Sequence, residues 1–167
     1  GSMNGRILRE TQSIFSYPEI NFTQELAALQ KIRAHDEYTY LHSINVARLS
    51  VNLGQRLGVS GDHMIQLGWA ALLHDVGKLQ VPTNILNKVK QFTPEELKIM
   101  QSHPWAALLE SENLPMEKIE SISRLMAAFE HHQRYDLQGY PSVRGKLRLH
   151  PFSRIVAIAD TFDAMTS

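Results

Sequence analysis

The stretch from Ser60 to Lys78 reads SGDHMIQLGWAALLHDVGK and holds the most apolar segment of the 167-residue chain. Between Ser60 and Leu73, apolar side chains occupy nearly every face of a helix, which is typical of a helix buried at the centre of a domain. The segment ends in two ionisable residues, His74 and Asp75, and Gly77 follows as a candidate cap. Ionisable groups are costly in a core unless their charge is compensated, and a metal cation does so strongly. The stretch therefore predicts a central helix with a candidate metal site at its end.

Helical periodicity extends to both sides of this segment. Thr23 is a candidate cap of one helix, and Asp36 of a second helix that Gly58 closes. A third begins at Thr93-Pro94-Glu95-Glu96, where a capping threonine precedes a proline and two acidic residues, and is expected to stop near His103-Pro104.

Apolar spacing predicts two more helices towards the end of the chain. The helix over residues 117–132 is expected to pack inward through Ile119, Ile122, Leu125, Met126 and Phe129. The helix over residues 154–165 is expected to form a final packing seam of Ile155, Ile158, Phe162 and Met165. No segment alternates apolar and polar residues as a strand does, so the predicted fold is an all-α, single-domain helical bundle.

Composition excludes several classes of protein. The chain has 17 Lys and Arg against 17 Asp and Glu, so it lacks the broad basic field of a protein that binds polymeric nucleic acid. It has no cysteine, which excludes disulfides, thiolate zinc sites and iron–sulfur clusters. Its longest apolar run, residues 67–73, is far shorter than the ~18 residues that cross a bilayer, and we expect a cytoplasmic chain without a membrane segment.

The first residues are set apart from the domain. Gly1-Ser2-Met3 is typical of an expression scar, and residues 1–20 are polar and irregular. We expect residues 1–20 to be this scar with a leader or linker, and residues 21–167 to form the domain.

Five of the predicted helix ends and faces carry histidines or carboxylates next to apolar positions. Each histidine taken singly is more often a satisfied core or helix-end residue than a ligand, but together they supply enough nitrogen and oxygen ligands for two metal ions. A set without thiolates suits Fe, Mn, Zn or Ni. The candidates are His42, His74, Asp75, His103, His131, His132 and Asp160. The adjacent His131 and His132 can converge only where their helix unwinds, because neighbouring helical residues point about 100° apart.

A second His-Asp pair, His35-Asp36, provides a contrast. It lies in a polar stretch at a helix junction, and we interpret it as a solvated pair and not as a metal site.

Two metals held by such ligands indicate a specific chemistry. A water that bridges them is acidified to hydroxide, and the pair clamps the attacking and leaving oxygens of an in-line displacement at phosphorus. Lys78 would supply a positive charge for a phosphate oxygen. The alternative for Lys78 is a solvated lysine that a helix C-terminus favours.

From about Tyr38 onward the chain resembles the HD-GYP branch of the HD-domain phosphohydrolases, bacterial enzymes that hydrolyse cyclic di-GMP. The resemblance rests on several blocks in the family's order: Tyr38-Thr39, His42-Ser43, Val46-Ala47, Leu73-His74-Asp75-Val76-Gly77-Lys78, Val81-Pro82, Ile85-Leu86, His103-Pro104, His131-His132, Gly139-Tyr140-Pro141, Ile158-Ala159-Asp160 and Phe162-Asp163-Ala164-Met165-Thr166-Ser167.

The resemblance implies roles for individual residues. It assigns the seven candidates above to the metals, with Asp75 as the bridging ligand, and implies catalytic roles for Asp75 and Lys78. It places Lys78 and Tyr140 at the substrate. Some relatives bind a third metal through a glutamate where this chain has Tyr38, so two divalent ions, Fe or Mn, are expected. The implied reaction is hydrolysis of cyclic di-GMP to linear pGpG or GMP by a metal-bridging hydroxide.

Departures from the family pattern keep alternatives open. This chain has Gln133 after the paired histidines, Leu137 two positions before Gly139, and Ala107 after His-Pro, where the family commonly has Glu, Gly and Gly. Relatives also continue past the position of Ser167 with a basic segment, and usually carry a sensor or receiver domain upstream. The alternatives are a non-catalytic module that senses cyclic dinucleotides or docks proteins, and an HD phosphohydrolase that acts on another nucleotide.

Overall fold

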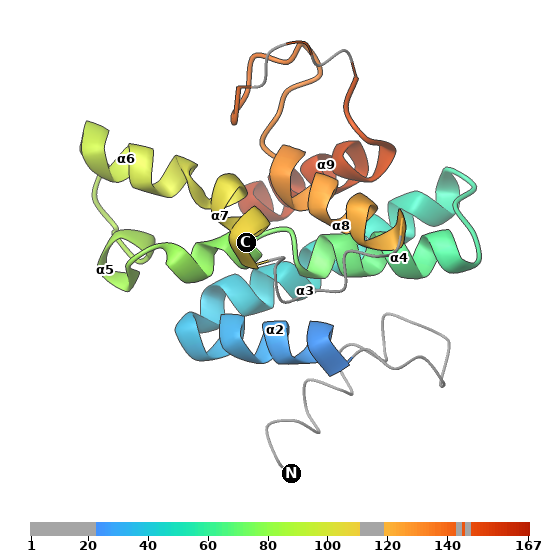
Figure 1. Cartoon of the computed structure of the whole chain (residues 1–167), viewed down its shortest axis with the longest axis horizontal. Coiled ribbons are helices and arrows are strands. Elements are labelled where there is room, and N and C mark those ends of the chain that lie inside the picture. Colours follow the sequence, from blue (N-terminus) through green and yellow to red (C-terminus); the bar gives the residue numbers. More distant parts are fainter. Residues whose placement is uncertain (1–22, 111–118, 143–144, 146–147) are drawn as a thin grey trace.

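Helices make up most of the part of the chain that the computed structural model describes, which comprises residues 23–110, 119–142, 145 and 148–167 (Figure 1). No strand occurs among these residues, as the sequence predicts. The elements in chain order are α2 (Thr23–His35), α3 (Glu37–Arg56), α4 (Asp62–Leu72), the 3-10 helix η1 (Val76–Gln80), α5 (Thr83–Leu86), α6 (Pro94–Gln101), α7 (His103–Glu110), α8 (Ile119–Glu130) and α9 (Pro151–Thr166).

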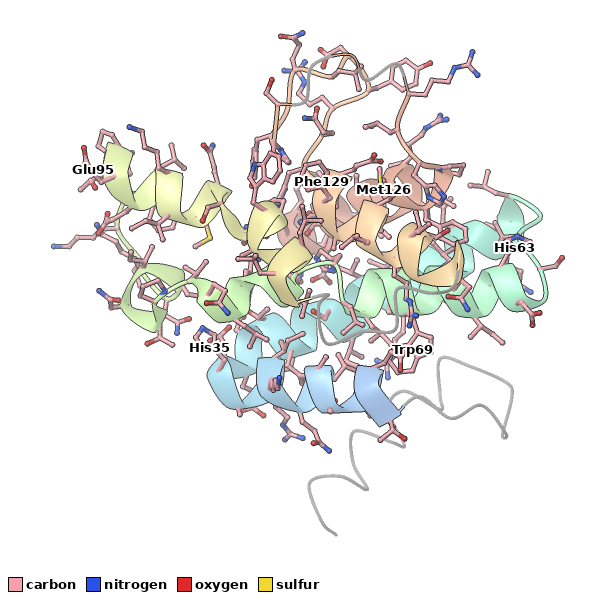
Figure 2. The ribbon with its side chains drawn as sticks, viewed as in Figure 1. His35, His63, Trp69, Glu95, Met126 and Phe129 are labelled. Carbon is pink, nitrogen blue, oxygen red and sulfur yellow. The ribbon has the colours of Figure 1, made fainter. Side chains whose placement is uncertain are left out.

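Helix α4 is the buried centre of the bundle, as its sequence predicts. It packs against α3, α8 and α9, and Leu67, Trp69 and Leu72 are almost completely buried. Its outer end reaches solvent at His63, as does the outer end of α6 at Glu95 (Figure 2). The inner end of α4 therefore delivers His74 and Asp75 to the middle of the molecule.

Gly77 has a different role from the predicted helix cap. Helix α4 already ends at Leu72, and Gly77 lies inside η1. A Cβ atom at Gly77 would lie 1.9 Å from the carbonyl oxygen of His103 and 2.7 Å from the amide nitrogen of Ala107. The glycine is needed because η1 and α7 touch backbone to backbone, and the small Ala107 is buried beside it.

Two predicted caps are confirmed. The Asp36 carboxylate accepts a hydrogen bond from the Thr39 amide at 2.7 Å, and Thr93 forms a capping box with Glu96 at the start of α6.

The other His-Asp pair, His35-Asp36, is bonded within the protein. His35 contacts the carbonyl oxygen of Val81 at 3.0 Å. The pair His35-Asp36 thus stabilises local structure and is not part of the metal site, as predicted. Its side chains are hydrogen-bonded within the protein, however, and not simply solvated as expected.

The predicted stop of the third helix is confirmed, since α6 ends at Gln101, directly before His103-Pro104. His103 itself begins α7, because a proline in second position is typical of a helix start. Two predictions about packing faces are wrong. Ile122 is exposed, since α8 instead buries the small residues Ala127 and Ala128 close to its neighbours. The seam of α9 is only partly internal: Ile155 is buried, whereas the other three members lie at the surface, namely Ile158, Phe162 and Met165. Residues 117–118 of the predicted 117–132 helix lie outside the described residues.

None of the described helices is both long enough and apolar enough to cross a membrane.

Candidate metal centre

Five separate segments bring all seven predicted ligands to one place. His42 comes from α3, His74 and Asp75 from the junction of α4 with η1, and His103 from the first residue of α7. His131 and His132 follow the end of α8, where the helix has unwound as predicted, and Asp160 comes from α9. Their ligand atoms form three overlapping groups in which all atoms lie within 4.8 Å of one another: Asp75 with His103, His131 and His132; His42 with His74 and Asp75; His74 with His131 and Asp160.

Asp75 lies between two sets of histidines, one for each carboxylate oxygen. Its Oδ2 atom is 3.2 Å from Nε2 of His74 and 3.9 Å from Nε2 of His42. Its Oδ1 atom is 3.3 Å from Nε2 of His103 and 3.6 Å from Nε2 of His131. A carboxylate in this position can bind one cation through each oxygen.

The histidine rings are oriented by bonds at their other nitrogen. Nδ1 of His74, His103 and His131 lies 2.7, 2.8 and 3.0 Å from the backbone carbonyls of Ala71, Met100 and Ala128, three residues earlier in each case. A carbonyl only accepts hydrogen bonds, so each Nδ1 carries the proton and each Nε2 presents a lone pair. This is the arrangement that metal-binding histidines usually have.

The same lone pairs place several hydrogen-bond acceptors close together without a donor between them, and a cation would compensate their mutual repulsion. Nε2 of His103 and Nε2 of His131 face each other at 3.3 Å, and both are acceptors in this tautomer. Nε2 of His74 and Oδ1 of Asp75 are buried without a hydrogen-bond partner among the described residues. Buried acceptors that converge without a donor are costly. The donor set therefore fits divalent metal ions.

Burial and neighbouring charges together set the protonation states that metal binding requires. It lowers the pKa of His103 to about 4 and, together with the nearby His131, that of His132 to about 2. Burial raises the pKa of Asp160, but the hydrogen bond from His42 and the nearby His74 outweigh it and bring this pKa to about 2. Neutral imidazoles beside ionised carboxylates are the form of these groups that binds cations.

Asp163 is a member of the site that sequence reasoning missed. Its Oδ2 atom lies 2.7 Å from Nδ1 of His42, and both side chains are buried. Nε2 of the same ring lies 2.9 Å from Oδ1 of Asp160. The available signal was the spacing of Asp160 and Asp163, since residues three apart share a helix face.

Lys78 is paired within the site. Its Nζ atom donates to Oδ2 of Asp75 at 2.6 Å, and its side chain is 21% exposed. Burial lowers the pKa of Lys78, but the Asp75 charge outweighs it and the pKa is raised. Lys78 is therefore a charged neighbour of Asp75 and not the solvated lysine of the alternative interpretation.

The Gly139-Tyr140-Pro141 loop folds back onto the paired histidines. The ring of Tyr140 stacks on His132 with centroids 4.6 Å apart, and its amide donates to the carbonyl of His132 at 3.3 Å. Gln133 is buried and its amide donates to the carbonyl of Pro141. A glutamate carboxylate could not make that bond. The loop is therefore held against His132 by the ring and amide of Tyr140 and by the hydrogen bond from Gln133 to Pro141.

Leu137 shows how the loop accommodates a departure from the family pattern. Its φ is +62°, in the left-handed region where glycine is favoured. The backbone thus adopts a glycine-like conformation although the side chain is leucine.

Comparison with known proteins agrees with this fold. The HD domain family model matches residues 18–167. A cyclic di-GMP phosphodiesterase of Pseudomonas aeruginosa is 33% identical over 144 residues, covering 85% of this chain and 34% of its own length. A cyclic di-GMP phosphodiesterase of Thermotoga maritima is 39% identical over 136 residues, covering 79% of this chain and 35% of its own length.

A solved structure shares the fold. An HDG"Y"P protein of Bdellovibrio bacteriovorus superposes with a TM-score of 0.64 at 20% identity, covering 98% of this chain and 58% of that one. The chain belongs to the HD domain family, and its Gly139-Tyr140-Pro141 loop identifies the HD-GYP branch. It spans about a third of the length of the two phosphodiesterases.

Proposed function

We propose that this chain is a metal-dependent phosphodiesterase that hydrolyses cyclic di-GMP to linear pGpG or GMP. The observation that carries the proposal is the position of Asp75, whose two oxygens face separate pairs of histidines in the centre of an HD-GYP fold. Two relatives that match most of this chain are named cyclic di-GMP phosphodiesterases.

We assign two divalent ions, Fe or Mn, to the seven ligands. His42 and His74 would hold one ion and His103, His131 and His132 the other, with Asp75 shared and Asp160 beside His42 and His74. Tyr38, where some relatives have a glutamate ligand for a third ion, offers no carboxylate. Bound ions would supply an acidified water and positive charge for in-line displacement at phosphorus.

The chain's own residues would position the substrate around this centre. The Lys78 ammonium lies at the buried Asp75, where a non-bridging phosphate oxygen would gain from a fixed positive charge. Tyr140, stacked on His132, would limit the orientation of the nucleotide at that side of the centre. Packing of both residues against metal ligands keeps them in place before substrate arrives.

The first test compares anaerobically purified, metal-quantified protein with the Asp75→Ala variant, following cyclic di-GMP and its products by chromatography. Turnover in the wild type alone is the expected result. Wild-type protein loaded with Fe or Mn that leaves cyclic di-GMP intact would overturn the proposal. Binding without turnover would then indicate a sensing module, and hydrolysis of a different nucleotide in the same assay would indicate another substrate.

The proposed reaction also implies a cellular compartment and a regulatory input. Hydrolysis of a second messenger belongs in the cytoplasm, where the messenger acts, and needs an input that controls it. We propose a sensor or receiver domain, or a regulatory protein, as that input.

A further inference from the structure

Three large apolar side chains of α9 lie exposed beside the metal centre. Ile158, Phe162 and Met165 are 61%, 53% and 75% exposed, and their spacing places them on one face of the helix. Exposed apolar patches of this kind commonly mark binding sites. Asp160, a predicted metal ligand, lies between two of them in the sequence.

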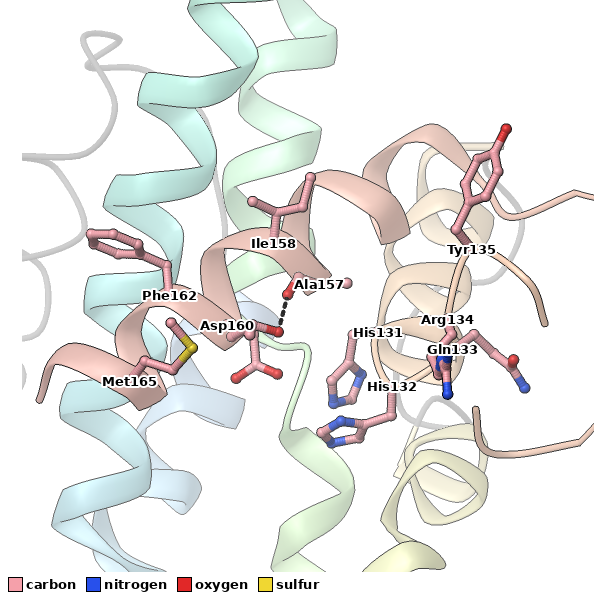
Figure 3. A pocket seen from close by; sticks show the side chains of 11 residues that line it. His131, His132, Gln133, Arg134, Tyr135, Ala157, Ile158, Asp160, Phe162 and Met165 are labelled. Atoms are coloured by element: carbon pink, nitrogen blue, oxygen red, sulfur yellow. Dashed lines mark hydrogen bonds between the residues drawn. The ribbon is translucent and has the colours of Figure 1, made fainter. Parts of the chain in front are cut away.

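These side chains and the metal ligands line the same open cavity of about 650 Å³. Figure 3 shows Phe162 and Met165 on one side of Asp160, with His131 and His132 on the other side and Arg134 and Tyr135 beyond them. Cavities that bind small ligands typically have about 300–1,000 Å³ and combine apolar walls with a few polar groups. A ligand in this cavity would contact the metal ligands and the apolar wall together.

We propose that Ile158, Phe162 and Met165 form a nucleobase subsite, with the Phe162 ring as the stacking surface. This inference rests on the proposed function, which places a phosphodiester at the metal centre. A base is joined to that phosphate through a ribose, so it must lie in the space next to the centre. The flat apolar face of a purine suits the exposed faces of aromatic and aliphatic side chains.

The subsite has a defined selectivity. Stacking is tolerant of base identity because every base has a π-face. The apolar wall therefore favours a nucleotide over a phosphodiester without a base, but discriminates little among cyclic purine dinucleotides.

The test uses four proteins: the wild type, Phe162→Ala, Phe162→Tyr and the control Leu109→Ala. Leu109 is 64% exposed on α7 and does not line the cavity. Binding is measured by calorimetry with metal-loaded protein and a phosphorothioate analogue of cyclic di-GMP, which is cleaved slowly. Hydrolysis is measured with cyclic di-GMP and with methyl p-nitrophenyl phosphate, a chromogenic diester that has no nucleobase.

Phe162→Ala is expected to weaken binding of the analogue about tenfold, the effect of losing one stacked base. The ratio of kcat/KM for cyclic di-GMP to that for the small diester should fall by a similar factor, mainly through KM. Phe162→Tyr retains the ring and should restore both values, and Leu109→Ala should match the wild type.

The outcomes separate the subsite from the proposed function. Wild-type binding of the analogue with no hydrolysis of either diester would overturn the function, while the calorimetry would still decide the subsite. Equal binding by wild type and Phe162→Ala would overturn the subsite and favour a protein segment as the occupant of this face. An equal loss of kcat for both diesters would also overturn it, since that pattern indicates a disturbed metal centre.

Discussion

His42 is held between two carboxylates of one helix: Asp163 lies 2.7 Å from its Nδ1 atom and Asp160 lies 2.9 Å from its Nε2 atom. Because a carboxylate only accepts, Asp163 fixes the proton of the ring on Nδ1. Nε2 can donate to Asp160 in the same way, and a cation bound beside Asp160 would take the place of that second proton. Asp163 therefore positions a predicted ligand without belonging to the ligand set itself.

Asp163→Asn is expected to weaken metal binding about tenfold to a hundredfold, because partners of this kind orient the ligand and raise its basicity. The measurement is a metal titration of the chelated protein, with metal content read by mass spectrometry. Thr166→Val is the control on the same helix, since this hydroxyl is exposed and donates only to backbone carbonyls. Wild-type affinity in Asp163→Asn would contradict the role of Asp163.

Asp75→Ala is expected to remove one or both metals and abolish hydrolysis, because the carboxylate shared by the two histidine sets is lost. The chain offers a matched control in its other His-Asp pair. Asp36→Ala removes a helix cap at a cost of about 1 kcal/mol and should leave the metal content intact. Full metal content in Asp75→Ala would refute the bridging assignment.

Lys78→Ala is expected to keep the metals and to lower kcat/KM by about a hundredfold or less, as removal of one stabilising donor does. The metals would balance the charge of Asp75 when its lysine partner is gone. Metal analysis and steady-state kinetics on the same sample test both parts, and Lys78→Arg should recover some of the rate. Loss of metal from Lys78→Ala would show that the lysine maintains the centre itself.

Leu137→Gly is expected to stabilise the protein by about 1 kcal/mol, because a left-handed φ of +62° is unfavourable for leucine and not for glycine. The greater freedom of glycine in the unfolded chain reduces this gain. Urea denaturation measures the difference. A clear loss of stability would mean that contacts of the leucine side chain outweigh its backbone strain.

The contribution of Asp36 to stability should depend on pH. Burial raises the pKa of Asp36, but hydrogen bonds from Thr39 and Asn87 outweigh it, and the folded pKa lies below 3.8. A depressed carboxyl pKa gives stability that is fully present above 3.8 and is lost as pH falls through the folded value. The stability difference between metal-free wild type and Asp36→Ala should therefore shrink in acid. A constant difference from pH 6 to 2.5 would be inconsistent with this.

The helical fold was predictable because it depends on local patterns. The ligand set was predictable because ionisable residues recur at the ends of apolar helices and match the blocks of the resembled family, although ligands such as His42 and Asp160 lie 118 residues apart. The apolar run before His74 predicts the central helix, and its ionisable end predicts where the site lies. The unwinding that lets His131 and His132 converge follows from helix geometry alone.

The role of Asp163 was not predictable in this way, because its partner His42 is 121 residues away. The same limit applies to Ile158, Phe162 and Met165. Periodicity shows that they share a face, but not whether another helix covers it. Gly77 was misread for a similar reason, since its role depends on His103 and Ala107, which lie in another helix.

The backbone contact at Gly77 fixes the distance between two segments that carry candidate metal ligands. Asp75 and His103 each lie within two residues of the place where the backbones of η1 and α7 touch. Because no side chain lies between the two backbones there, repacking of side chains cannot change the distance between these two segments. Even one methyl group at position 77 would force the strands of main chain apart at that point. The separation of the two ligands is therefore set by peptide geometry, which tolerates far less variation than side-chain packing does.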